Sequence, residues 1–426
     1  MDLTGNSVTG TEFPRRKAAA DKPLVAAESR CLSPNCHRLL TWAEAHLEGT
    51  IGLLREFVEC ESPSDDPAAI HRFNELFIAR IAGMGEVSAF AGGHLRCRFH
   101  LPGAKRRKGP GGGPPNQPPP GGGHILALGH SDTVWPLGTL SRMPFRREQG
   151  RLWGPGVLDM KGGLAFLLMA VRALRDLDVP VRRHVLLQLN ADEEVGSAGS
   201  RPLTEAAAKE SVAVLVLEPG TGLEGKLKTA RKGVGDYTVT VRGRASHAGI
   251  DFETGASAIV ELARQIARIA AFTNIARGVT VNPGVISGGT RTNVVAEEAR
   301  VEVDVRVSRL RDAAPLDRKF RALRPVDKRC SITVAGGLNR PPMERTPGNR
   351  RLFEQARSIA AAELGIALEE SATGGGSDGN FTSALGVPTL GGLGTVGEGA
   401  HAANESILVD RIPGRVALLA LLLARL

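Results

Sequence analysis

Apolar residues follow two different periods along this chain, and the change of period marks its parts. From Thr41 to Phe57 they recur every three or four positions, which predicts an amphipathic helix. After residue 124, short apolar runs alternate with a stretch of helical spacing. These segments are 125–128, 164–177, 185–189 and 212–217. Strands that alternate with helices predict an α/β fold with a mostly parallel sheet flanked by helices.

A period of two begins near Lys232. The four valines at 301, 303, 305 and 307 alternate with polar residues, as do Tyr237, Val239 and Val241, and this pattern is typical of antiparallel strands with one buried face. A helix face at Ile259, Leu262, Ile266 and Ile269 and a strand at 331–334 complete an α+β unit. We therefore expect this unit, residues 232–339, to be inserted into a larger domain made of 41–231 and 340–426.

Two segments lack the pattern of a folded core. Residues 1–40 show little periodicity and are expected to be a disordered arm. Residues 102–123 contain 15 Gly or Pro among 22 positions, and this composition predicts a flexible surface loop. The basic run 105–108 inside it could touch an acidic partner, although a solvated loop is the simpler interpretation.

Composition narrows the class of protein. With 42% hydrophobic and 23% charged residues over 426 positions, the chain is globular and not wholly disordered. Aromatic residues, at 4%, are too few for a nucleic-acid reader built on stacking, so the net charge of +9 predicts no specific nucleic-acid partner. The longest apolar run, 416–423, is too short to cross a bilayer. Five scattered cysteines and a polar N-terminus predict a cytoplasmic protein.

Acidic and imidazole side chains follow the predicted strands at the points where these end. Because the carboxyl ends of parallel strands meet at one edge of a sheet, these side chains are expected to converge on one crevice. They are His130, Asp132, Asp159, Glu193, Glu194, Glu218 and His401. Gathering them without a cation would be electrostatically costly, and the mixture of imidazole and carboxylate suits zinc.

Charge balance favours two zinc ions. Three ligating carboxylates and one bridging hydroxide would neutralise two Zn²⁺, and Co²⁺ or Mn²⁺ could replace them. Glu193, directly before Glu194, is then the natural general base. Other interpretations stay open: His130 and Asp132 could be a hydrogen-bonded pair, and Asp159 could cap the following helix.

Five sequence blocks, taken in order, resemble the di-zinc exopeptidases that include glutamate carboxypeptidase, aminoacylase, acetylornithine deacetylase and succinyl-diaminopimelate desuccinylase. The blocks are Gly129-His130-Ser131-Asp132, Gly154 to Gly163, Asp192-Glu193-Glu194, Ser246-His247-Ala248-Gly249 and Gly374-Gly375-Gly376-Ser377-Asp378. The resemblance covers roughly residues 45–426, and Glu218-Pro219 is similar to the bacterial glutamate carboxypeptidase branch.

This resemblance implies a role for each residue of the crevice. Asp159 would bridge the two metals, His130 and Glu218 would bind one ion, and Glu194 and His401 would bind the other. Glu193 would act as general base and then acid, and Asp132 would orient His130. The peptide bond between Asp159 and Met160 would be cis.

The inserted unit resembles the family's lid and dimerisation domain, which implies a homodimer. His247 and Asn293 would reach the site, often from the partner subunit, and stabilise the oxyanion. Arg340 would grip the substrate's free carboxylate, and Arg306 would be a second substrate-side arginine. Arg306 could equally be a solvated residue on a polar strand face. Gly376 would let the backbone approach the ligand.

The resemblance implies a zinc-dependent hydrolase that cleaves an amide bond next to a free carboxylate, with a metal-bridged hydroxide as nucleophile. The substrate would be a small peptide or an N-acyl amino acid. The alternative is a deacylase of another N-acyl amino acid, which shares the zinc chemistry. A non-catalytic scaffold on the same fold is a third hypothesis, and it predicts the loss of a ligand or of the base. The sequence loses none of them.

Overall fold

The computed structural model describes residues 34–103 and 123–426. The arm expected over residues 1–40 is wrong from Pro34 onward, because helix α1 (Pro34–Ala45) begins there. The rest of that arm, and the part of the Gly/Pro segment at 104–122 with its basic run, lie outside the described residues.

The single helix expected from Thr41 to Phe57 is two helices. Helix α1 is followed by α2 (Leu47–Glu59), and the two are separated at His46, whose φ of −105° and ψ of 17° are not helical. The Nδ1 atom of His46 lies 2.7 Å from the Trp42 carbonyl oxygen, an acceptor that it shares with its own backbone N–H. This local competition for one acceptor accompanies the break, and the apolar spacing carries no sign of it. Helix α3 (Pro67–Ile81) follows and is capped by Asp66.

The main sheet has six strands in the order β1-β2-β6-β3-β7-β14. They are β1 (Gly85–Ala89), β2 (Leu95–Phe99), β6 (Val185–Asn190), β3 (His124–His130), β7 (Ser211–Val216) and β14 (Thr389–Leu390). Strands β6, β3, β7 and β14 are parallel, and β2 and β1 extend the sheet antiparallel at one edge. The prediction of a mostly parallel sheet is confirmed.

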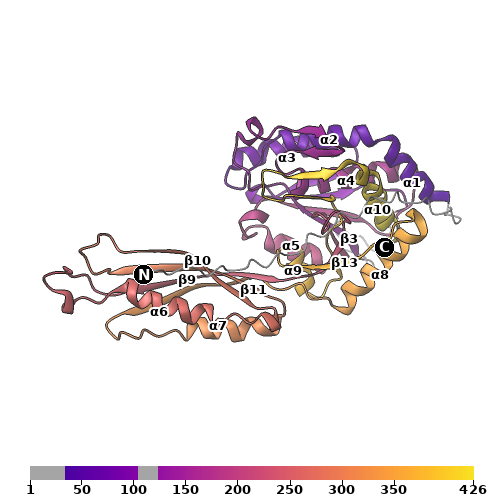
Figure 1. Ribbon diagram of the computed structural model, residues 1–426. Coiled ribbons are helices and arrows are strands. Elements are labelled where there is room, and N and C mark those ends of the chain that lie inside the picture. The colour runs from indigo at the N-terminus through magenta and orange to yellow at the C-terminus, as the bar shows by residue number, and fades with distance from the viewer. Residues whose placement is uncertain (1–33, 104–122) are drawn as a thin grey trace, which may run out of the picture. The chain divides into compact units, whose positions relative to one another are not determined.

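Helices cover both faces of this sheet. Alternate residues of its central strand are apolar on both faces, so both faces must be buried. Ile125 and Ala127 of β3 join the large core under α4 (Gly162–Asp176) and α10 (Ile412–Arg425), whereas Leu126 and Leu128 pack beside α5 (Arg201–Lys209). Figure 1 shows α4 and α10 on one side of β3 and α5 with α9 (Gly379–Ala384) on the other. Among the described residues, no helix is long and apolar enough to cross a membrane.

One glycine allows helix α4 to approach β7 closely. A Cβ atom on Gly163 would overlap the carbonyl oxygen of Leu217, directly before Glu218. We expect Gly163→Ala to lower the free energy of unfolding by about 3 kcal/mol, the upper end of overpacking costs, because a backbone carbonyl cannot rotate away. Urea unfolding of Gly52→Ala in α2 is the control. A Cβ atom added at that exposed position would meet nothing within 4 Å beyond its own helix turn, and the change should stabilise by about 0.5–1 kcal/mol. Equal midpoints for Gly163→Ala and the wild type would contradict this.

A separate antiparallel sheet follows, in the order β10-β11-β9-β12. Its strands are β10 (Thr280–Gly288), β11 (Glu298–Val307), β9 (Gly233–Arg242) and β12 (Ser331–Arg340). Helices α6 (Ala258–Ala270) and α7 (Ala313–Arg321) pack on one face of it (Figure 1). The antiparallel prediction is confirmed, but β12 runs to Arg340, six residues further than expected. The domain boundaries themselves stay a prediction.

The core face of α6 is rotated from the one expected. Leu262 and Ile269 are fully buried, but Ile259 is 44% exposed. Two polar residues, Glu261 and Gln265, are buried in its place, and they bond to each other and to the 324–327 segment. An apolar count could not detect polar side chains on a core face.

Two small sheets complete the chain. Strands β8 (Leu227–Arg231) and β13 (Glu370–Thr373) form a parallel pair. Strands β15 (Gly397–Glu398), β16 (Ser406–Leu408), β5 (Arg151–Trp153) and β4 (Arg146–Glu148) form an antiparallel sheet in that order. This second sheet places the loop that carries His401 beside the strand that leads to Asp159.

Candidate metal centre

His130 is the last residue of β3, and its ring is buried and held on one side. Its Nδ1 lies 2.9 Å from the Asp132 carbonyl oxygen and 3.4 Å from the Asp132 carboxylate. Burial raises the pKa of Asp132, but the hydrogen bonds and charge that His130, Ser64 and the Glu194 N–H bring to the carboxylate together lower it below its usual value. The ring is therefore fixed with Nε2 facing the crevice, 3.4 Å from Asp159 and 3.8 Å from Glu218.

Asp159 lies between the two histidines. It follows a turn at Gly156, whose φ is +73°, and the Asp159–Met160 peptide bond is cis. Its Oδ1 lies 3.4 Å from Nε2 of His130, and its Oδ2 lies 3.5 Å from Nε2 of His401. Burial opposes the charged form, yet the neighbouring imidazoles of His130 and His401 hold the pKa of Asp159 well below its usual value. Each carboxylate oxygen thus faces a different imidazole.

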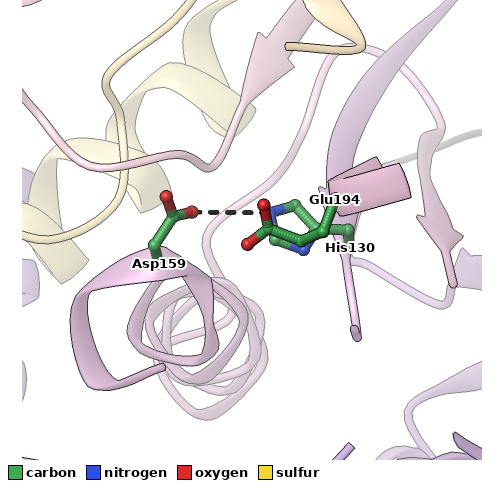
Figure 2. A group of neighbouring side chains, drawn as sticks. All are labelled: His130, Asp159 and Glu194. Atoms are coloured by element: carbon green, nitrogen blue, oxygen red, sulfur yellow. Dashed lines mark ion pairs between the residues drawn. The ribbon is translucent and has the colours of Figure 1, made fainter. Parts of the chain in front are cut away.

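Glu194 and His401 form the second side of the centre. Glu194 lies in the short helix η4 (Glu193–Val195) after β6, and its Oε1 is 3.2 Å from Nε2 of His401. Figure 2 shows the side chains of His130, Asp159 and Glu194 directed toward one another. His401 has a positive φ of 60° and is half-exposed. The neighbouring carboxylates of Asp159 and Glu194 raise the pKa of His401 to about 10.

Glu218 follows β7 on the His130 side. It is buried, with Arg231 Nη2 3.4 Å from its carboxylate. Burial and the nearby Asp159 raise the pKa of Glu218, and Arg231 and His130 act against this rise. The ion pair with Arg231 leaves Oε1 of Glu218 directed toward His130.

The residues fit a metal cation. Among the described residues, His130 Nε2, Asp159 Oδ1 and Glu194 Oε1 are buried without a hydrogen-bond partner, which is costly unless something else binds them. Ligand atoms of His130, Asp159 and Glu194 lie within 4.8 Å of one another, and so do those of His130, Glu193 and Glu218. A divalent cation would satisfy these atoms and offset the acidic charge.

Glu193 lies between this cluster and Arg340. Its backbone N–H donates to Asp132, as does that of Glu194, so Asp132 holds the turn as well as His130. Burial raises the pKa of Glu193 well above its usual value, and Arg340 opposes this, with Nη2 3.0 Å from the carboxylate. A buried carboxylate with a raised pKa beside such a cluster is a candidate general base.

Arg340, at the end of β12, is bonded to Glu193 and to a buried polar pair. Its Nη2 donates to Glu193, to Ser197 Oγ and to Asp378 Oδ1. Its Nε is buried without a partner among the described residues. One guanidinium nitrogen is thus engaged with the candidate base, and Nη1 donates to Asn339 Oδ1 at 3.5 Å.

Loss of the Arg340 charge should change the pH dependence of catalysis. Arg340 lowers the pKa of Glu193, so Arg340→Gln should raise that pKa. Because a base acts only when ionised, the acidic limb of the kcat/KM profile should move to higher pH. Arg201→Gln is the matched control, since Arg201 stacks on the same Phe381 ring but pairs with Glu205. An acidic limb that stays in place in Arg340→Gln would remove Arg340 from this role.

The remaining predicted residues fall into two groups. Gly376 belongs to the Gly-rich turn, and a Cβ atom there would lie 3.1 Å from Arg340 Cδ. Arg306 lies beside this turn, where it pairs with Asp304 and donates to Gly374 O at 3.5 Å. His247 and Asn293 are exposed and adjacent, since Ala248 N donates to Asn293 O. No hydrogen bond or ion pair joins either to the cluster within 34–103 and 123–426.

Three further residues hold the centre and were not predicted for it. Ser64 Oγ donates to Asp132 at 2.7 Å, Asp378 bonds to Arg340, and Glu405 accepts the backbone N–H of Asp159. Asp378 belongs to the Gly-rich block, residues 374–378, that contributes to the family resemblance. Its position in that block could therefore have identified it. Ser64 and Glu405 act through tertiary contacts that leave no local pattern.

Comparison with known proteins places this chain in a family. A family model described as peptidase family M20/M25/M40 matches residues 126–425. Carboxypeptidase G2 from Pseudomonas sp. (strain RS-16) is 31% identical over 296 residues, which are 69% of this chain and 71% of that protein. Acetylornithine deacetylase from Myxococcus xanthus is 32% identical over 191 residues, 42% of this chain and 48% of that one.

A solved structure shows the same fold. The aminopeptidase PepT from Bacillus cereus ATCC 10987 superposes with a TM-score of 0.68 at 22% identity, and the match covers 89% of this chain and 98% of that one. The family match extends over most of the chain. It agrees with the fold of two sheets and with the cluster of side chains at the strand ends. The chain therefore belongs to peptidase family M20/M25/M40 and is a metallohydrolase.

Proposed function

We propose that this chain is a two-zinc exopeptidase that cleaves an amide bond next to a free carboxylate, in the manner that the name carboxypeptidase G2 implies for its relative. One observation carries the proposal: Asp159 presents one carboxylate oxygen to His130 and the other to His401. A carboxylate placed in this way can bind two cations at once, one on each side.

The metal ligands proposed are His130, Asp159 and Glu218 for one ion and Asp159, Glu194 and His401 for the other. Imidazole nitrogen with carboxylate oxygen is a donor set that suits zinc, and Co²⁺ or Mn²⁺ are possible substitutes. When bound, two such ions would polarise the scissile carbonyl and acidify a water.

The chain's own residues would supply the proton transfers. Glu193 takes the proton from the attacking water and returns it to the leaving amine. Its burial and raised pKa favour holding that proton between the two steps. Asp132 keeps the His130 ring oriented through the contacts at Nδ1.

Substrate recognition would come from arginine and backbone donors. Arg340 Nε has no hydrogen-bond partner in the part of the chain that the structure describes, which supports the proposal that Arg340 binds the substrate's carboxylate. Arg306 and Gly376 lie along the Gly-rich turn beside it. His247 and Asn293 are proposed to act on the oxyanion.

We further propose a homodimer through the antiparallel sheet. Strand β10 is an edge strand, and its Val285 and Ile286 are 58% and 60% exposed. His247 and Asn293, which make no contact with the cluster among the described residues, would then serve the partner's site. Light scattering of the purified protein would give the number of chains.

A deacylase of an N-acyl amino acid is the second candidate. The similarity to acetylornithine deacetylase favours it, and both reactions need the same metals and base. The two differ in the acyl group and the amine that the pocket accepts.

A substrate panel tests the proposal. Zinc-loaded protein is given N-acyl glutamates, N-acetylornithine and dipeptides, each as the free acid and as the α-amide, with and without a chelator. We expect chelator-sensitive release from free acids with a C-terminal acidic residue and at least about tenfold less from the amides, the discrimination expected when a buried arginine loses its partner. Release from N-acetylornithine alone would favour the deacylase. No release from any substrate by protein that holds zinc would overturn the proposal.

A further inference from the structure

Glu405 has a fully buried carboxylate that accepts four hydrogen bonds. Its Oε2 accepts from Trp135 Nε1 at 2.8 Å and from Gly156 N at 2.9 Å. Its Oε1 accepts from Leu158 N at 2.9 Å and from Asp159 N at 3.1 Å. All four partners are N–H donors, so each oxygen is satisfied from two sides.

These donors come from segments that carry different metal ligands. Trp135 lies in the segment that follows His130, and Gly156 to Asp159 form the turn that ends in the bridging carboxylate. Glu405 itself is four residues after His401, in the loop between β15 and β16. One side chain thus joins the three segments that hold His130, Asp159 and His401.

The Asp159 turn depends on an acceptor from outside. Asp159, with φ of −117° and ψ of 98°, is not helical, so its N–H has no partner of the kind that a regular helix supplies. Both oxygens of Glu405 face this turn, from Gly156 to Asp159. Only an ionised carboxylate offers two acceptor oxygens here, because an amide would turn one N–H group toward other N–H groups.

We propose that Glu405 is a positioning residue of the metal centre, which fixes the Asp159 turn and the His401 loop in the geometry that binds metal. The proposal rests on the proposed function, because it concerns the same centre. It assigns Glu405 no contact with metal or substrate. Its effect is on how well the ligands are arranged before the metal arrives.

The test compares Glu405→Gln with a matched variant, Glu261→Gln. Glu261 is also a fully buried carboxylate that accepts two backbone N–H groups, but it lies in α6 of the antiparallel sheet unit. For each full-length variant, zinc affinity is measured by competition with a chromogenic chelator. Tm is measured with and without zinc.

We expect Glu405→Gln to lower zinc affinity by about 10- to 100-fold and to reduce the rise in Tm on zinc binding. Glu261→Gln should lower the Tm of both forms and leave zinc affinity unchanged. Trp135→Phe keeps an aromatic ring but removes one donor to Glu405, so it should weaken zinc binding by a smaller factor. This variant takes the place of Glu405→Gln if that variant does not fold.

The outcomes separate the two proposals. If Glu405→Gln binds zinc as tightly as the wild type, the positioning role is overturned and the proposed function stays intact. The same holds for Trp135→Phe if only that variant folds. A loss of zinc affinity in Glu261→Gln as large as that in Glu405→Gln would reduce Glu405 to general stability. A wild type that binds no zinc would overturn the proposed function, and the inference with it.

Discussion

Glu193→Gln is expected to lower kcat by about 100- to 10,000-fold, the contribution of a general base. The amide keeps the shape of the side chain and can still accept from Arg340, but it cannot take a proton from water. Burial raises the pKa of Glu193, and few other carboxylates among the described residues combine that shift with a place beside the cluster. Steady-state rates are measured together with metal content by elemental analysis.

Its neighbour supplies the control. Glu194→Gln removes the carboxylate that faces His401, so it should lower metal content as well as the rate, whereas Glu193→Gln should keep its metal. Glu193 also lies in a candidate ligand group with His130 and Glu218, so a loss of metal from Glu193→Gln would be informative as well. Metal loss from Glu193→Gln would make Glu193 a ligand, and a rate within a few-fold of the wild type would exclude it as the base.

Asp159→Asn is expected to abolish measurable turnover and to weaken binding of both metal ions. Asp159 faces both histidines, so replacing one of its oxygens with an N–H₂ group affects both sides of the centre. We expect zinc affinity to fall by more than about 100-fold, beyond the loss typical of a residue that only supports a ligand. Zinc titration followed by calorimetry would measure each site.

Asp192→Asn is a matched control for that variant. Asp192 stands after the same strand as Glu193, but its carboxylate accepts from Gly199 N and Ser200 N, away from the cluster. It should bind zinc as the wild type does. If Asp159→Asn retained two zinc ions with unchanged affinity, the bridging role of Asp159 would be wrong.

The sequence predicted the features that depend on strand pattern. The valine alternation at 301–307 identified β11, and the apolar runs at 125–128 and 185–189 identified β3 and β6. Because these last two strands are parallel, their ends lie together, and the sequence alone could place His130 and Glu194 in one crevice.

Features that depend on backbone or polar contacts could not be predicted in this way. The break at His46 accompanies a side chain that shares a carbonyl acceptor, and the buried pair Glu261 and Gln265 lies on the core face of α6. Glu405 bonds mostly to backbone N–H groups, which every residue type except proline carries, so its partners have no sequence signature. The contact between Arg340 and Glu193 joins residues 147 positions apart.

A zinc titration of the metal-free protein, with hydrolysis of an N-acyl glutamate measured at each step, tests the proposed two-metal centre most directly. We predict negligible activity without metal and a rise to a plateau at about two zinc ions per chain. A plateau at about one ion would contradict the bridging arrangement around Asp159. Full activity in protein shown to be free of metal would contradict the metal centre itself.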